Sequence, residues 1–209
     1  MRYTLPGKVI LLTGVEPFGG EKVNPSILAC RRLDGKRFNG YTVKVEEVPL
    51  RFTEIRGTIE GHIKKHRPAA VISTGQGGGS WLNLERVAIN VADATRVAYN
   101  CGTKPRDAAL VEGGPAAYFT GLPIRKLLEK VRAGGVPAEI SNSAGAFGCN
   151  QIFYHLMDYA AREKLGIPAG FIHVPKLPEQ VVETKEPHMS LDLIARGLEI
   201  VVEEVSGEL

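Results

Sequence analysis

Cysteine is scarce in this sequence, and the three that occur, Cys30, Cys101 and Cys149, stand far apart in a chain of 209 residues. An odd number of widely spaced cysteines gives neither a disulfide framework nor a CxxC metal pair. The pattern therefore favours a reducing compartment. Residues 1–8 also lack the hydrophobic region of a signal peptide, so cytoplasmic localisation is the expectation.

Long hydrophobic runs and a strong excess of one charge are missing as well. No apolar run is long enough to span a membrane, so no membrane association is expected. The formal net charge is only +3, and no basic stripe carries interleaved aromatic residues, which argues against nucleic acid as the main partner. Without repeats, low-complexity segments or linkers, the length fits one domain over residues 1–209.

Apolar runs typical of strands alternate along the chain with helical periodicities. The expected strands are 8–13, 41–48, 69–73, 84–91, 138–141 and 169–175. One expected helix starts at Asn24-Pro25, and the other four cover 52–66, 123–131, 151–160 and 190–205. Residues 97–114 indicate a long excursion or an irregular hairpin. This order predicts an α/β protein, a three-layer α/β/α sandwich with a mostly parallel twisted central sheet.

The stretch around Cys149 is the one on which the functional prediction depends. After the strand 138–141, Gly145 and Gly148 permit a sharp turn, and apolar residues then recur at helical spacing. Cys149 therefore falls in the first helical turn, where free N–H groups and the helix dipole stabilise a thiolate. A small buried residue is the alternative for any cysteine, but the strand–turn–helix setting favours a nucleophile.

His173 and Glu85 are candidates to act with this thiol. His173 lies near the end of the strand after the Cys149 helix, and parallel strands joined by a right-handed crossover can lie side by side. A cysteine with a histidine base, oriented by a third group, is a thiol-hydrolase arrangement, although a satisfied core histidine is the alternative. Glu85 either points inward and needs a partner or, if its strand starts later, is simply exposed.

Two glycine-rich loops, 14–20 and 75–79, follow expected strands. Proteins of the α/β class usually place ligands at such strand ends. The second loop is a poor nucleotide signature, because the third glycine of GxGxxG falls at Ser80 and no Walker-type lysine is present. It remains a candidate for a backbone segment that lies close to a small ligand.

Together these stretches resemble the pyroglutamyl peptidase I (pyrrolidone-carboxylate peptidase) family. The matching segments run in the family's order through nearly the whole chain: 13–20 with 24–26, 85–90, 114–118, 122–124, 143–150, and 170–175 with 177–180. The resemblance implies a cytosolic cysteine peptidase that removes an N-terminal pyroglutamyl residue from peptides. It also implies a compact α/β/α fold, a homodimer or homotetramer, and no cofactor or metal.

The resemblance assigns roles to individual residues. It makes Cys149 the nucleophile, His173 the general base and Glu85 the group that holds the imidazole. Backbone N–H groups near Cys149, with Arg96, would stabilise the tetrahedral oxyanion. The candidates for binding the substrate are Phe18, Asn24, Gln76 and Phe147.

Four positions depart from the family pattern. Val15 replaces an aromatic residue, Ser80 stands in a segment that commonly carries arginine, Thr95 stands as an insertion, and Gly148 replaces an aliphatic residue. None is among the three catalytic candidates. Two other interpretations stay open: a pyroglutamate- or peptide-binding homologue with weakened catalysis, and a nucleoside-processing enzyme on a related α/β scaffold.

Overall fold

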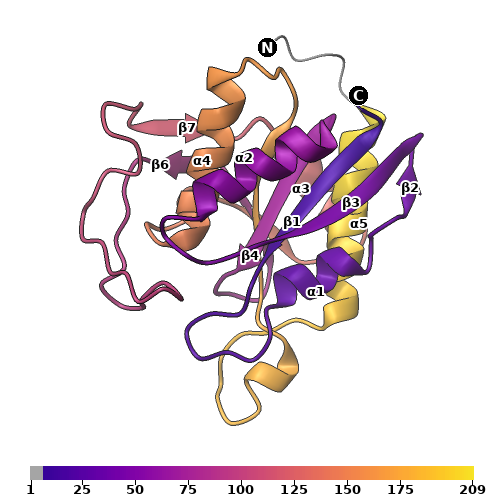
Figure 1. The fold of residues 1–209 in the computed structure, drawn as a ribbon. Helices are drawn as coiled ribbons and strands as arrows, with labels where there is room; N and C mark the ends of the chain where they lie inside the picture. Colours follow the sequence, from indigo (N-terminus) through magenta and orange to yellow (C-terminus); the bar gives the residue numbers. More distant parts are fainter. Residues whose placement is uncertain (1–6) are drawn as a thin grey trace.

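Seven strands form the central sheet of the computed structural model, which describes residues 7–209 (Figure 1). In spatial order they are β2 (Arg37–Phe38), β3 (Tyr41–Val48), β1 (Val9–Val15), β4 (Ala70–Gln76), β9 (Ala169–Val174), β5 (Leu82–Glu85) and β8 (Ala138–Ser141). Strands β3, β1, β4 and β9 are parallel, whereas β2, β5 and β8 run the other way. The predicted α/β class with a mostly parallel sheet is confirmed.

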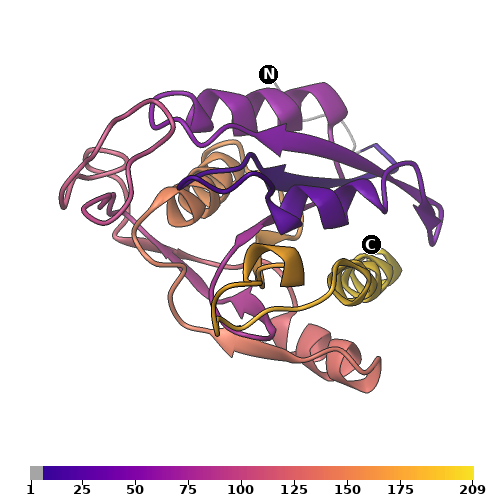
Figure 2. The ribbon, with the colours of Figure 1, turned by 90° about the horizontal axis from the view of Figure 1, so that it is seen from below.

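Helices cover both faces of this sheet. Helices α1 (Pro25–Arg31), α3 (Ile124–Ala133) and α5 (Leu191–Gly207) pack together on one face, and α2 (Ile55–His66) and α4 (Gly148–Arg162) pack on the other. Figure 2 shows α2 (purple) and α5 (yellow) on opposite sides of the strands. A short 3-10 turn, Pro178–Gln180, lies between β9 and α5. Within residues 7–209, no helix has the length and apolarity needed to cross a bilayer.

The continuous apolar run of β1 is explained by burial on both faces. Ile10 and Leu12 contribute to the core beneath α1, α3 and α5, whereas Leu11 contributes to the core beneath α2 and α4. All three side chains are fully buried. A strand between two helical layers has no solvent-facing side, so its sequence does not alternate.

Helix starts follow the predicted capping chemistry. Asn24 caps α1 by accepting a hydrogen bond from the Ser26 N–H at 3.0 Å, and Pro25 is the first helical residue. The approach of α1 to β1 requires a glycine, because a Cβ at Gly14 would lie 2.4 Å from the Ile27 Cα. These contacts fix the loop between β1 and α1 at the carboxyl end of the sheet.

The predicted strand 84–91 is wrong, because the chain changes sheets in its middle. Strand β5 belongs to the central sheet, whereas β6 (Val87–Ile89) pairs antiparallel with β7 (Ala117–Phe119). At the change-over, Arg86 donates its N–H to the Ser141 carbonyl, while its own carbonyl accepts from the Thr120 N–H, both at 2.9 Å. Residues 90–116, between β6 and β7, form an irregular hairpin, one of the two predicted alternatives (Figure 1). This long segment is called the excursion below.

The prediction that β8 and β9 lie side by side is also wrong. Strand β5 lies between them. Because β5 pairs antiparallel with β9 and parallel with β8, β8 and β9 run in opposite directions. The crossover argument for a contact between Cys149 and His173 therefore fails. The second glycine-rich loop also starts later than predicted, since Gly75 and Gln76 still belong to β4.

Candidate active site

Cys149 occupies the second position of helix α4. Phe147 is the extended N-cap residue, and Gly148 and Cys149 are the first two helical residues. The N–H groups of a first helical turn have no acceptor within the helix and point toward its N-terminal end. The Cys149 side chain is buried, with 6% of the residue exposed. The predicted position of this thiol at a helix N-terminus is confirmed.

Two glycines at the end of β4 create the space for the thiol and for His173. A Cβ at Gly75 would lie 2.8 Å from the Cys149 Sγ and 2.9 Å from the Phe171 Cζ. A Cβ at Gly77 would lie 2.8 Å from the His173 Cβ. These glycines let the backbone of this segment lie against the side chains of the site, and its predicted closeness to a small ligand stays a prediction.

Glu85 and His173 form a buried pair across strands β5 and β9. Asn83 lies opposite His173 in the antiparallel ladder, so Glu85, two residues further along, is on the same face of the sheet. The Glu85 Oε1 lies 2.8 Å from the His173 Nδ1, and Glu85 is 1% exposed. The inward-pointing alternative for Glu85 is confirmed, with His173 as its partner. Strand β5 between β8 and β9 is what brings the carboxylate there.

The charge of this pair is set by Cys149 as well as by Glu85. Burial alone lowers the pKa of His173, but the charge of Cys149 and hydrogen bonds to Cys149 and Glu85 outweigh it and raise the pKa to about 10. The imidazole is therefore protonated near neutral pH when it faces a thiolate. Neighbouring opposite charges stabilise each other more strongly in a buried site than in water.

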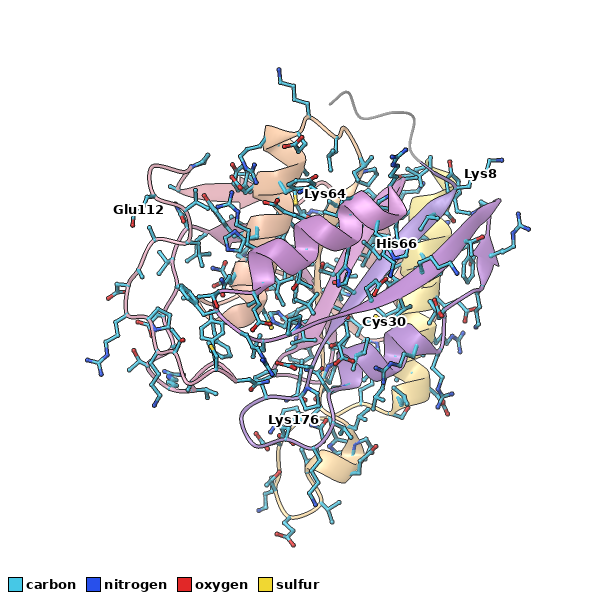
Figure 3. All side chains as sticks on the ribbon, in the orientation of Figure 1. Lys8, Cys30, Lys64, His66, Glu112 and Lys176 are labelled. Atoms are coloured by element: carbon cyan, nitrogen blue, oxygen red, sulfur yellow. The ribbon has the colours of Figure 1, made fainter. Side chains whose placement is uncertain are left out.

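Cys30 provides the contrast within the same chain. It lies on α1 (Figure 3). It is fully buried and makes a 3.3 Å contact with the Thr74 hydroxyl of β4. Burial, opposed by the Thr74 hydrogen bond, raises the pKa of Cys30 to about 12. Cys30 is therefore a neutral core thiol.

Aromatic rings line the N-terminal end of α4. The rings of Phe18 and Phe147, two of the predicted substrate-binding residues, lie 5.9 Å apart. The Phe147 ring also lies 4.6 Å from Tyr99, whose ring contacts Phe52 edge-on at 5.3 Å. The structure thus brings the two predicted rings together and adds those of Tyr99 and Phe52, which sequence reasoning did not include.

Glu16 ties the three loops that carry these rings. Its Oε1 accepts hydrogen bonds from the Leu50 N–H at 2.8 Å and from the Asn100 Nδ2 at 2.7 Å. Leu50 precedes Phe52, Asn100 follows Tyr99, and Glu16 itself precedes Phe18. One carboxylate therefore fixes the relative positions of the loops that carry Phe18, Phe52 and Tyr99.

The other predicted binding residues lie in different settings. Asn24 uses its Oδ1 for the helix cap and its Nδ2 to donate to the Glu16 carbonyl at 3.1 Å, so these contacts position the first loop. Gln76 ends β4, and its Oε1 accepts from the Gln180 Nε2 at 2.9 Å. Arg96 is exposed, and within residues 7–209 no hydrogen bond or ion pair holds its guanidinium. Their roles toward substrate stay predictions.

Sequence reasoning missed Asn150, which binds the backbone of strand β6 next to Cys149. Its Oδ1 accepts from the Ile89 N–H at 2.9 Å, and its Nδ2 donates to the carbonyls of Ile89 and Val91 at 2.9 and 3.0 Å. The side chain is fully buried. An asparagine directly after Cys149, among apolar residues at helical spacing, was the available signal.

A family model described as pyroglutamyl peptidase matches residues 8–208. The chain belongs to the pyroglutamyl peptidase family. The pyrrolidone-carboxylate peptidase of Bacillus licheniformis is 45% identical over 195 residues, which cover 93% of this chain and 90% of that protein. The corresponding protein of Bacillus subtilis is 43% identical over 194 residues, or 92% and 90% of the two chains.

Solved structures give the same family. Pyroglutamyl peptidase I of Bacillus amyloliquefaciens is 42% identical, with a TM-score of 0.93 over 96% of this chain and 98% of that one. A mutant pyrrolidone carboxyl peptidase from Pyrococcus furiosus is 35% identical, with a TM-score of 0.91 and the same coverage. The names of these relatives do not favour either alternative for this chain, the nucleoside-processing enzyme or the binding homologue with weakened catalysis.

In the described part of the chain, no group of three or more His, Cys, Asp and Glu side chains is arranged to bind an ion. The chemistry available at Cys149 is that of a thiol beside an imidazole and a carboxylate. Such a group performs acyl transfer through a covalent intermediate.

The closeness of Gly75 to the thiol leads to a testable prediction. Gly75→Ala is expected to lower kcat/KM by about 10²-fold, because the new Cβ must displace the Cys149 Sγ or the Phe171 ring. Gly78→Ala is the matched control, since a Cβ there meets nothing within 4 Å. Steady-state kinetics on both variants, with thermal unfolding as a check on folding, tests the prediction. Equal activity of Gly75→Ala and Gly78→Ala would contradict it.

Proposed function

We propose that this chain hydrolyses the amide bond that follows an N-terminal pyroglutamyl residue of a peptide. In this proposal Cys149 is the nucleophile, His173 the general base and acid, and Glu85 the group that orients the imidazole. The observation that carries it is the Cys149 thiol at the start of α4, next to an imidazole held 2.8 Å from a buried carboxylate. The names of the relatives support pyroglutamyl peptides as the substrate class.

The first half of the reaction forms a thioester. The Cys149 thiolate attacks the carbonyl carbon of the scissile amide, and the carbonyl oxygen becomes an oxyanion. N–H groups of the first turn of α4, which have no intrahelical acceptor, donate to this oxyanion, with Arg96 as a further candidate donor. The imidazolium of His173 then gives its proton to the leaving amine as the carbon–nitrogen bond breaks.

The second half releases pyroglutamate. Neutral His173 takes a proton from water while the water oxygen attacks the thioester carbon. The tetrahedral intermediate collapses, the carbon–sulfur bond breaks, and Cys149 leaves as a thiolate beside the imidazolium. Throughout, Glu85 accepts the Nδ1–H hydrogen bond, so the Nε2 side of the ring is free to exchange the proton.

The pocket is suited to a small neutral ring. Pyroglutamate is an uncharged lactam, so apolar walls and a few hydrogen bonds suffice to bind it. Phe18 and Phe147 provide the walls, Gln76 offers backbone groups at the end of β4, and Asn24 fixes the first loop. The partners of the protein are therefore peptides with an N-terminal pyroglutamate, and we place it in the cytoplasm as a homodimer or homotetramer.

The experiment compares fluorogenic amides of pyroglutamate, proline and glutamine in reducing buffer that contains a metal chelator. We expect turnover of the pyroglutamyl amide and negligible turnover of the other two, because both carry a charged amine in place of the neutral lactam nitrogen. Binding of a lactam without turnover in a folded protein would overturn the proposal in favour of a binding homologue. Turnover that depends on added phosphate would favour a nucleoside-processing enzyme.

A further inference from the structure

Tyr99 is a buried residue of the long excursion between β6 and β7. It is 1% exposed, and its ring packs between Phe147 and Phe52. It also lies over the start of α4, because a Cβ added to Gly148 would be 3.5 Å from the Tyr99 Cε1. Gly148 directly precedes Cys149, so this ring belongs to the surroundings of the nucleophile.

The hydroxyl of Tyr99 is an unsatisfied polar group. It is buried and has no hydrogen-bond partner within residues 7–209. A buried hydroxyl without a partner is destabilising, and a phenylalanine would fill the same space without that cost. A partner supplied by a bound molecule would remove the cost in the complex.

The backbone holds Tyr99 in place before any ligand binds. The Tyr99 N–H donates to the Thr103 carbonyl at 3.1 Å, and the Tyr99 carbonyl accepts from the Gly102 N–H at 2.7 Å. The next residue, Asn100, donates its side-chain amide to Glu16 and its N–H to the Leu50 carbonyl. This tight turn is thus fastened to both neighbouring loops, which preorganises the phenol for recognition.

The phenol is a hydrogen-bond donor under all ordinary conditions. Burial, followed by the negative charges of Cys149 and Cys101, raises the pKa of Tyr99 above its usual value. A neutral phenol keeps its proton even when the nucleophile is a thiolate. The Cys149 thiol is itself only 6% exposed, and it belongs to the same buried cluster as Tyr99.

We propose that Tyr99 determines specificity by donating a hydrogen bond from its phenol to the ring carbonyl of the pyroglutamyl group. The lactam ring offers one carbonyl acceptor and one N–H donor, and a protonated phenol beside an apolar wall complements the acceptor. The assignment rests on the proposed function, because it takes pyroglutamate as the substrate. It adds a side-chain donor to a pocket whose other predicted walls are apolar.

The test compares Tyr99→Phe with the parent protein, with Tyr41→Phe, on the far end of β3, as the control for loss of a phenol elsewhere. We expect KM for the pyroglutamyl amide to rise about tenfold while kcat changes less than about twofold, because the bond forms equally in the ground and transition states. Thermal unfolding of Tyr99→Phe is expected at the parent temperature or above, since the variant loses an unpartnered hydroxyl.

Two ring compounds identify the atom that Tyr99 contacts. Affinities for 2-pyrrolidone and cyclopentanone are measured calorimetrically, which requires no turnover. Both keep the ring carbonyl and only the first has an N–H, so both are expected to bind Tyr99→Phe about tenfold more weakly. Unchanged affinity for both, weaker binding of 2-pyrrolidone alone, or a fall in kcat at constant KM would each overturn the inference. An inactive parent that binds 2-pyrrolidone through Tyr99 would instead refute the peptidase function.

Discussion

Cys149→Ala is expected to lower kcat for the pyroglutamyl amide by about 10⁴–10⁶-fold. The carbonyl carbon then lacks its nucleophile, and the activity that remains comes from binding and from the oxyanion donors alone. The side chain is small and buried at the start of α4, so alanine fits without disturbing its neighbours. Kinetics of the purified variant, with thermal unfolding to confirm its fold, provide the measurement.

Selective alkylation of Cys149 is an independent test of its assignment as the nucleophile. Cys101 is exposed, and hydrogen bonds from Thr103 lower its pKa, so it competes with Cys149 for iodoacetamide. Cys30 does not compete, because it is fully buried. The experiment therefore uses the Cys101→Ser background, in which we expect one modified thiol, loss of activity in step with its modification, and protection by 2-pyrrolidone.

Either of two results would remove Cys149 from the mechanism. One is substantial pyroglutamyl amide turnover by a folded Cys149→Ala variant. The other is full activity of the Cys101→Ser protein after its Cys149 thiol has been alkylated. A covalent intermediate gives a positive control: mass spectrometry of rapidly quenched parent enzyme is expected to show a pyroglutamyl group on the peptide that contains Cys149.

Local signals in the sequence predicted most of the fold. Asn24-Pro25 and Ser190 both begin helices as expected, because capping needs only a side-chain oxygen and a backbone N–H a few residues away. The strands Tyr41–Val48 and Ala138–Ser141 have the predicted bounds. These features depend on neighbours in the chain, which are visible in the sequence.

Features that depend on distant partners were not predictable in the same way. The break at Arg86 exists because Ser141 and Thr120 take its backbone groups, and neither is near it in sequence. The reversal of β5 next to β9 likewise has no local signal, although it is what brings Glu85 to His173. The Glu85–His173 pair was therefore predicted from the family resemblance, whereas the argument from strand order, which concerned Cys149 and His173, was mistaken.

Tyr99 shows the same limit within the site. It lies in an excursion without periodicity, where its place relative to Gly148 is set by Glu16 and Asn100. The sequence departs from the family pattern at Gly148, and in the structure the ring of Tyr99 together with Leu50 lies over that glycine. The space that a side chain at position 148 would occupy is thus partly filled by residues of two other loops.

Glu85→Gln is expected to lower kcat/KM by about 10²–10⁴-fold while the protein remains folded. Glutamine has nearly the same shape, but it carries no charge to stabilise the imidazolium, and its amide N–H₂ group can turn toward Nδ1 and select the wrong tautomer. The fold is expected to tolerate the change, because it removes a buried charge whose Oε2 has no hydrogen-bond partner in the described part of the chain. Glu112→Gln, on the exposed rim of the excursion (Figure 3), is the matched control.

The pH profile separates this positioning role from a merely structural one. Against the effect of burial, Cys149 and Glu85 raise the pKa of His173, so removing the Glu85 charge lowers it. The imidazolium that protonates the leaving amine is then lost at a lower pH, and the alkaline limb of the kcat/KM profile is expected to move to lower pH in Glu85→Gln. A structural role would reduce activity evenly at all pH values and lower the unfolding temperature. An unshifted alkaline limb at unchanged stability would therefore mean that Glu85 does not act through the charge of His173.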